Sequence, residues 1–318
     1  MYSQPMLKPL LIALAAWASI GGASAATTVT WSFSSGASDI TTPGSQINRS
    51  PYGNTTSNVN TSVPIAGGPG NSATNTSGAW GNTIQTLNGG INATAQAWSN
   101  TGGTTSTSNS TNYSLESAYL GLYSGGVGVN NRDGIGSGAN SGDSGDVFST
   151  APEHAVDNQQ RYDSVLFSFS TAVTLQSMSL GYPDSGCSIN GTTCDTDMTV
   201  LAWTGTGTPT LTGTSYNAMD NAGSGWQLVG QYSNNPSNNT PFAINGGNAS
   251  SQYWLIGTCI PVFGTSCDTK ADVAKISTVA GFQTPPPGVP EPGSLGLAGI
   301  TIGALGLVRR LRRRGQSR

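Results

Sequence analysis

Carboxylates gather in one glycine-rich stretch of the chain, between residues 133 and 163. The members are Asp133, Asp143, Asp146, Glu153, Asp157 and Asp163. Ca²⁺ is bound by several oxygen ligands, which flexible loops punctuated by glycine can supply. The stretch is the best candidate for a structural calcium site, which Glu153 and Asp157 would form with Asp143 and Asp146 joining them. Glu153 and Asp157 are preferred as ligands over Asp143 and Asp146 because they come directly before a predicted strand that can hold them rigid. A solvated acidic loop without metal is the interpretation that such a stretch favours, and the calcium site is its alternative.

A second chemistry that the residues suggest is nucleophilic. Gly142-Asp143-Ser144-Gly145 resembles the nucleophile motif of trypsin-like serine proteases. The single histidine, His154, follows Ser144 by ten residues, whereas that family places its histidine far upstream. A Ser–His pair also needs the base within hydrogen-bond reach of the hydroxyl. We therefore expect a protein that is not an enzyme, with a secreted hydrolase as the alternative.

Four cysteines form two local pairs in the sequence. Cys187 and Cys194 enclose one turn-rich segment, and Cys259 and Cys267 enclose another. Four cysteines allow three connectivities, and local pairing is favoured because each pair closes a short loop. A zinc site is the rival, but the C-x-x-C spacing and the additional histidines of such sites are missing. The spacing predicts two disulfides and an oxidising compartment.

Charged residues make up only 8% of the chain, against about a quarter in ordinary soluble domains. Ser, Thr, Asn and Gly supply the polar surface instead, which is typical of secreted, β-rich, sugar-facing proteins. Between residues 26 and 288, five Lys and Arg stand against fourteen Asp and Glu, a net charge of about −9. Binding to nucleic acid is excluded, because no basic patch exists to displace counterions.

Tryptophans are the remaining candidates for binding, because an aromatic face can stack on the C–H face of a sugar ring. The candidates are Trp80, Trp98, Trp203, Trp226 and Trp254. Most tryptophans of a small β-domain belong to its core, so only those outside it could form a sugar platform.

Alternation of apolar and polar side chains predicts a series of short strands separated by Gly-rich turns. The predicted strands are 26–34, 93–98, 119–123, 126–129, 164–170, 173–182, 198–203, 226–232, 253–259 and 273–282. The phase slips between Leu175 and Met178, which predicts a bulge or a bend between sheets. No stretch between residues 26 and 288 keeps a helical period. The fold class is therefore all-β, a sandwich or barrel with long Gly/Ser/Thr/Asn-rich loops.

The same patterns predict the domain organisation. Residues 26–112 are a low-complexity, Asn/Thr/Ser/Gly-rich region that contributes the first strand or strands of the sandwich and otherwise forms long loops or disorder. Residues 113–284 are the β-sandwich domain. Residues 285–288 are a Pro-rich, stiff spacer.

The N-terminus carries the marks of an export signal. Lys8 is positive, residues 10–20 are apolar, and Ala23-Ser24-Ala25 is a small-x-small cleavage site. Residues 1–25 are therefore predicted to be a signal peptide that is removed on export.

The C-terminus, residues 289–318, has three parts in a fixed order. Val289, Pro290, Glu291 and Pro292 are extended, because proline restricts both itself and the residue before it. Residues 293–308 are an apolar run that as a helix would reach about 24 Å, short of the roughly 30 Å of a hydrocarbon core. The arginines that follow are Arg309, Arg310, Arg312, Arg313 and Arg314. They should stay in the cytoplasm by the positive-inside rule, so this short transmembrane helix is predicted to be a temporary anchor.

This order resembles the PEP-CTERM sorting signal of Gram-negative bacteria that make exopolysaccharide. The resemblance implies cleavage by an exosortase near Pro290-Glu291-Pro292 and transient anchoring in the inner membrane. Delivery to the cell surface or the extracellular matrix would follow. An ordinary C-terminal membrane anchor is the alternative.

A second resemblance lies in the middle of the chain. Its parts are Gly126-Val127-Gly128-Val129, Pro152-Glu153-His154 with Asp157-Asn158, and Asp163-Ser164-Val165-Leu166 leading to Phe169. Together they are similar to the central block of exosortase-dependent surface proteins. The resemblance implies a jelly-roll-like sandwich and brings no catalytic residues. We therefore expect an exported protein of the cell surface or biofilm matrix, structural or adhesive, with exopolysaccharide as partner; a carbohydrate-binding module or a hydrolase acting on polysaccharide is the alternative.

Overall fold

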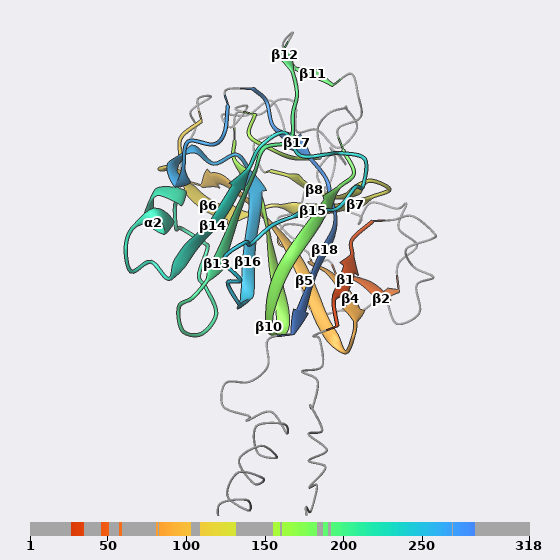
Figure 1. Cartoon of the computed structure of the whole chain (residues 1–318). Helices are drawn as coiled ribbons and strands as arrows, with labels where there is room; N and C mark the ends of the chain where they lie inside the picture. Colours follow the sequence, from red (N-terminus) through yellow and green to blue (C-terminus); the bar gives the residue numbers. More distant parts are fainter. Residues whose placement is uncertain are drawn as a thin grey trace, which may run out of the picture. The chain divides into compact units, whose positions relative to one another are not determined.

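Strands account for most of the regular structure (Figure 1). The computed structural model describes residues 27–34, 46–50, 57–58, 81, 83–102, 109–131, 155–159, 161–182, 187–189, 192–268 and 270–283. The predicted signal peptide, the Pro-rich spacer and the sorting signal lie outside these residues. Residues Thr27–Thr284 form one unit by their contacts.

The elements follow one another along the chain with few helical turns between them. The strands are β1 (Val29–Ser32), β2 (Gln46–Ser50), β3 (Ser57–Asn58), β4 (Thr83–Asn88), β5 (Ile91–Gly102), β6 (Ser114–Ser117), β7 (Tyr119–Tyr123), β8 (Gly126–Asn130), β9 (Val156–Asp157), β10 (Asp163–Leu180), β11 (Ser188–Ile189), β12 (Thr192–Thr193), β13 (Met198–Trp203), β14 (Trp226–Tyr232), β15 (Phe242–Ala243), β16 (Ser251–Thr258), β17 (Val273–Ala274) and β18 (Ile276–Gln283). Among the described residues, the short helix α2 (Tyr216–Asp220) and the 3-10 turn η2 (Pro261–Phe263) accompany them. The all-β prediction is confirmed. Within the described residues, no helix is both long and apolar enough to cross a membrane.

The long strand β10 organises the sheet. Its first half pairs with β5 on one side and β16 on the other, and its second half pairs with β18. The prediction of two separate strands, 164–170 and 173–182, was therefore wrong, because the chain bends into the second half without leaving the extended conformation. The predicted slip of phase is confirmed: the ladder with β18 shifts between Leu175 and Ser177.

One 14-stranded sheet bends along β10 and encloses the main core as two layers. The main layer has the order β14-β13-β16-β10-β5-β4, and the second contains β1, β18, β8 and β7, connected through the second half of β10. Trp31 on β1 meets Phe169 with ring centroids 4.8 Å apart, and Phe33 meets Phe167 at 5.1 Å. These aromatic contacts fix the short strand β1 against the first half of β10.

The outer face of the main layer carries a smaller core of its own. Leu201, Leu255 and Leu166 point to this face and are covered by the segment that contains α2 and by η2. Tyr216 of α2 is fully buried there, and its hydroxyl donates to the carbonyl oxygen of Tyr162 at 3.1 Å. The covering segment leaves the far end of this face half-exposed.

The low-complexity region contributes more strands than the sequence pattern predicted. The predicted strand 93–98 is the middle of β5, and β4 beside it was not predicted. The predicted strand 273–282 is interrupted at Lys275 and forms β17 and β18. The domain boundaries at residues 112 and 284 stay predictions.

Candidate functional site

Only part of the predicted calcium site can be placed. Asp157 lies in β9, buried, and its Oδ1 accepts a hydrogen bond of 3.0 Å from the backbone N–H of Gln159. Glu153, Asp143 and Asp146 lie outside the described residues, as do Ser144 and His154. The calcium site around Asp157 therefore stays a prediction.

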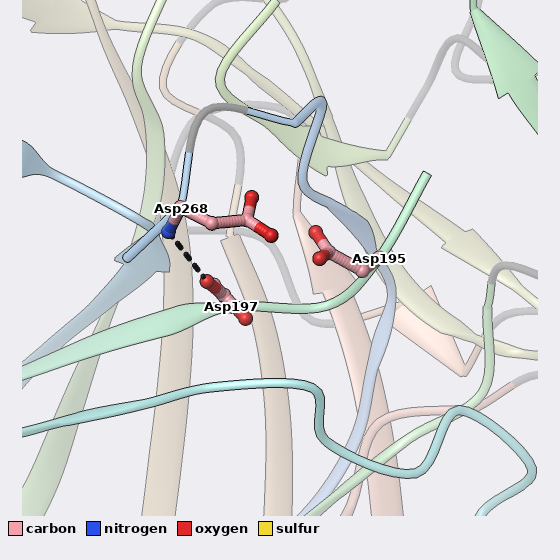
Figure 2. Close-up of side chains that lie close together, drawn as sticks. All are labelled: Asp195, Asp197 and Asp268. Carbon is pink, nitrogen blue, oxygen red and sulfur yellow. Dashed lines mark hydrogen bonds between the residues drawn. The ribbon is translucent and has the colours of Figure 1, made fainter. Parts of the chain in front are cut away.

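A different acidic cluster forms in the structure. The carboxylates of Asp195, Asp197 and Asp268 each bring an oxygen within 4.8 Å of the others (Figure 2). Within the described parts of the chain, this is the group whose spacing could suit a metal ion. Asp195 and Asp197 come just before β13, and Asp268 follows η2, so two segments far apart in sequence meet here. We call Asp195, Asp197, Asp268, Lys270 and Asp272 the acidic cluster.

Two disulfides position the acidic cluster. The local pairing that the sequence favours is the one found, with Cα–Cα distances of 5.5 Å for Cys187–Cys194 and 5.7 Å for Cys259–Cys267. Cys194 directly precedes Asp195, and Cys267 directly precedes Asp268. Each covalent loop therefore ends at a carboxylate of the cluster. A backbone hydrogen bond of 2.9 Å from Cys259 N to the carbonyl oxygen of Asp197 links the start of the second loop to the segment that follows the first.

Lys270 supplies a positive charge between two of the carboxylates. Its Nζ lies 3.0 Å from Asp195 Oδ2 and 2.8 Å from Asp268 Oδ2. Hydrogen bonds to Asp268 and Asp195 raise the pKa of Lys270, and the bond from Lys270 lowers the pKa of Asp268. Lys270 and Asp268 are both well exposed, so water and salt weaken this part of the network.

Asp197 is the buried anchor of the acidic cluster. Its carboxylate accepts from the backbone N–H of Asn234 at 2.6 Å and of Asp268 at 3.2 Å. Burial raises the pKa of Asp197, while these two backbone hydrogen bonds oppose the shift. The bond from Asp268 N, drawn in Figure 2, also fixes where the Asp268 side chain begins.

Asp272 is the fifth member of the acidic cluster, and its carboxyl group is protonated at neutral pH. It is fully buried, and burial together with a hydrogen bond to Asp195 raises its pKa to about 9. The buried Oδ1 of Asp195 receives no hydrogen bond from an N–H or a hydroxyl of the described residues. A proton on Asp272 lets the two carboxyl groups of Asp272 and Asp195 share a hydrogen bond, which two ionised carboxylates could not do.

The ammonium group of Lys270 already occupies the position of a cation in the acidic cluster. Hard oxygen ligands suit Ca²⁺, and three carboxylates within reach of one point fit it in principle. The ammonium of Lys270, however, bridges Asp195 and Asp268 where an ion would bridge them, and both oxygens of Asp197 accept backbone N–H groups. The cluster is therefore an ion-pair network that joins two disulfide loops, and Ca²⁺ would have to displace Lys270 to bind.

Sequence reasoning missed this cluster, although one signal was present. A six-residue segment is repeated in similar form: Gly191-Thr192-Thr193-Cys194-Asp195-Thr196 and Gly264-Thr265-Ser266-Cys267-Asp268-Thr269. The repeated Cys-Asp-Thr places a carboxylate directly after the second cysteine of each local pair. It could have indicated that the two loops have related roles.

Comparison with known proteins gives no identity. No family model matches the chain, and no curated protein matches it.

Proposed function

We propose that this chain is an exported protein of the bacterial cell surface or extracellular matrix, sorted by an exosortase. The observation that carries the proposal is the C-terminal order of Val289-Pro290-Glu291-Pro292, a short apolar run and an arginine cluster. The first part is the motif that is cleaved, and the apolar run is a temporary anchor in the inner membrane. The arginines keep the end of the chain in the cytoplasm.

Two features of the fold support this proposal. Both disulfides close within the described ectodomain, and disulfides persist in oxidising compartments outside the cytoplasm. The two-layered all-β architecture is compatible with the jelly-roll-like topology that the central motif implies, and we propose that topology for the sandwich.

The proposed molecular role is structural or adhesive and not catalytic. Exopolysaccharide is the proposed partner in the matrix, and the exosortase and the inner membrane are partners only during processing. A hydrolase acting on polysaccharide is the alternative in another class.

Replacing Pro290 and Pro292 by alanine tests the sorting step in the native bacterium. The variant should stay in the inner membrane with its C-terminus uncut, as detected by fractionation and an epitope tag placed between the signal peptide and the spacer. The matched control replaces Pro285 and Pro287 of the spacer, which should leave processing unchanged. Release of the Pro290/Pro292 variant into the medium at the mass of the wild type would contradict exosortase sorting.

A further inference from the structure

One row of half-buried side chains crosses the outer face of the main layer at the edge of the part that α2 and η2 cover, where Trp226 and Tyr253 pack against the smaller core. The register sets Trp203 opposite Trp226, Ser168 opposite both Tyr253 and Thr94, and Thr94 opposite Gln85. The pairing of Ala202 with Trp254 places Trp203 beside Tyr253. The outer row therefore runs in the order Trp226, Trp203, Tyr253, Ser168, Thr94 and Gln85.

The outer row points away from the main core. Trp254 and Ala202 face inward and are fully buried, so the alternation of a strand sends their neighbours Tyr253 and Trp203 outward. All six side chains of the row are of intermediate exposure. Of the predicted sugar-platform tryptophans, Trp254 and Trp98 are buried, Trp80 lies outside the described residues, and Trp203 and Trp226 remain.

The aromatic end of the row is held rigidly. The rings of Trp203 and Trp226 lie 5.3 Å apart between centroids, with planes at 60°. The Trp203 indole N–H donates to the carbonyl oxygen of Gly207 at 2.9 Å, and the hydroxyls of Tyr253 and Thr208 lie 3.0 Å apart. A Cβ on Gly205 would come within 2.4 Å of the Trp203 ring, and one on Gly225 within 2.5 Å, so these glycines let the backbone close onto it. A rigid aromatic surface loses little conformational entropy when a ligand binds.

The strands beneath the row are almost without charge. The six strands β4, β5, β10, β13, β14 and β16 contain no Lys, Arg, His or Glu, and their one Asp, Asp163, is fully buried. A polyanion or polycation would meet no opposite charge on these strands. Aromatic faces followed by hydroxyl and amide groups instead match a ligand with alternating C–H faces and hydroxyls.

We propose that the outer row binds an uncharged, extended polysaccharide chain. Trp226 and Tyr253 stack on sugar rings, Trp203 holds them in place, and Ser168, Thr94 and Gln85 hydrogen-bond the hydroxyls of the following rings. Adjacent strands lie about 4.8 Å apart, so six side chains span roughly 24 Å, enough for several sugar rings. This proposal rests on the proposed matrix function and gives that function a binding surface.

Binding of soluble glycans to the purified full-length chain tests the proposal. The probes are linear neutral hexasaccharides of glucose, xylose, mannose and galactose, and alginate as an acidic polymer, titrated by calorimetry and tryptophan fluorescence. At least one neutral hexasaccharide should bind and change the fluorescence. Trp226→Ala and Tyr253→Ala should each weaken the affinity for that hexasaccharide about tenfold, which is the scale of a binding hot spot.

Two further variants make the test specific to the row. Phe242→Ala removes a half-buried aromatic side chain from outside the outer row and should leave affinity unchanged, which controls for loss of stability. Gln85→Ala at the far end should weaken binding of the hexasaccharide and not of the disaccharide of the same sugar.

The outcomes separate this proposal from the sorting proposal. Three results would overturn glycan binding by the outer row. They are equal affinity in all variants, tighter binding of alginate than of every neutral probe, and no binding to any probe. A protein that binds a neutral glycan but stays uncut in the membrane contradicts exosortase sorting alone. A protein that is cut and exported but binds no neutral glycan contradicts glycan binding by the outer row alone.

Discussion

Asn158 and Asp272 lie 114 positions apart and are joined by three hydrogen bonds. Asn158 Nδ2 donates to Asp272 Oδ2 at 2.5 Å, Asp272 N donates to Asn158 Oδ1 at 2.9 Å, and Asn158 N donates to the Asp272 carbonyl at 3.3 Å. Asp272 Oδ1 in turn accepts from Asp197 N at 3.0 Å. The Asp-Asn pair of the central sequence motif thus connects the segment before β10 to the acidic cluster.

Asn158→Ala is expected to destabilise the fold by about 1–3 kcal/mol, because it removes the side-chain partners of the buried Asp272 Oδ2 and Asp272 N–H. Urea unfolding followed by circular dichroism measures this change. The control is Asn238→Ala, an exposed asparagine whose side chain accepts one bond from Thr240 N, with an expected change within about 0.5 kcal/mol. Equal stability of both variants would show that the connection between Asn158 and Asp272 contributes little.

The protonated Asp272 predicts a stability that falls as pH rises. Its pKa is raised from 3.8 to about 9 in the folded protein, so between these values the folded state binds more protons than the unfolded chain. The stabilisation is complete below about pH 4 and is lost as pH rises through about 9. Asp272→Asn should flatten this dependence in urea unfolding between pH 5 and 9, while losing the hydrogen bond from Asn158. A slope that survives the substitution would assign the dependence to another group.

The two disulfides should act on stability together. In the chain-entropy model each short loop contributes about 2–3 kcal/mol. Because both loops end at carboxylates of one network, removing both pairs as serine variants should cost a different amount from the sum of the single removals, by about 0.5–3 kcal/mol. Unfolding of the two single-pair variants and the combined variant measures this difference. Strict additivity would mean that the loops do not cooperate.

Removing the ammonium of Lys270 should open the acidic cluster to calcium. In the Lys270→Met variant, Asp195 and Asp268 lose their counter-charge, so millimolar Ca²⁺ should raise the Tm, as binding to the folded state alone requires. Adding Asp195→Asn to that variant should abolish the shift. A Lys270→Met protein whose Tm ignores calcium would show that the three carboxylates cannot form a metal site.

The same titration on the unchanged chain tests the calcium site predicted from the sequence. A Tm shift that Asp157→Asn removes and Asp195→Asn keeps would place calcium near residues 143–157. Absence of any shift at millimolar calcium would leave a solvated acidic loop there.

The strands that were predictable are those whose alternating side chains are strongly apolar. Val165, Phe167 and Phe169 mark β10 in this way, and even its slip of phase was visible in the sequence. In β4 the inward positions are Ile84 and Thr86, both buried, and a buried threonine gives no apolar signal. The strand forms because β5 pairs with it, which is a tertiary effect that local pattern cannot show.

The acidic cluster was missed for a different reason. Asp195 and Asp268 are far apart in sequence and meet only because β13 and β16 pair and bring their flanking loops together. Local density of carboxylates instead drew attention to residues 133–163. The local disulfide pairing was predictable because a short loop closes at low entropic cost, whatever the fold.

The intact mass of the protein recovered from the medium or surface of its native bacterium tests exosortase sorting most directly. Export and sorting predict a chain that begins at Ala26 and ends near Pro290-Glu291-Pro292, without the arginines from Arg309 to Arg314. The expected mass also falls by four hydrogens for the two disulfides and rises on reduction. A surface or secreted protein that retains the arginine cluster through Arg318 would contradict exosortase cleavage.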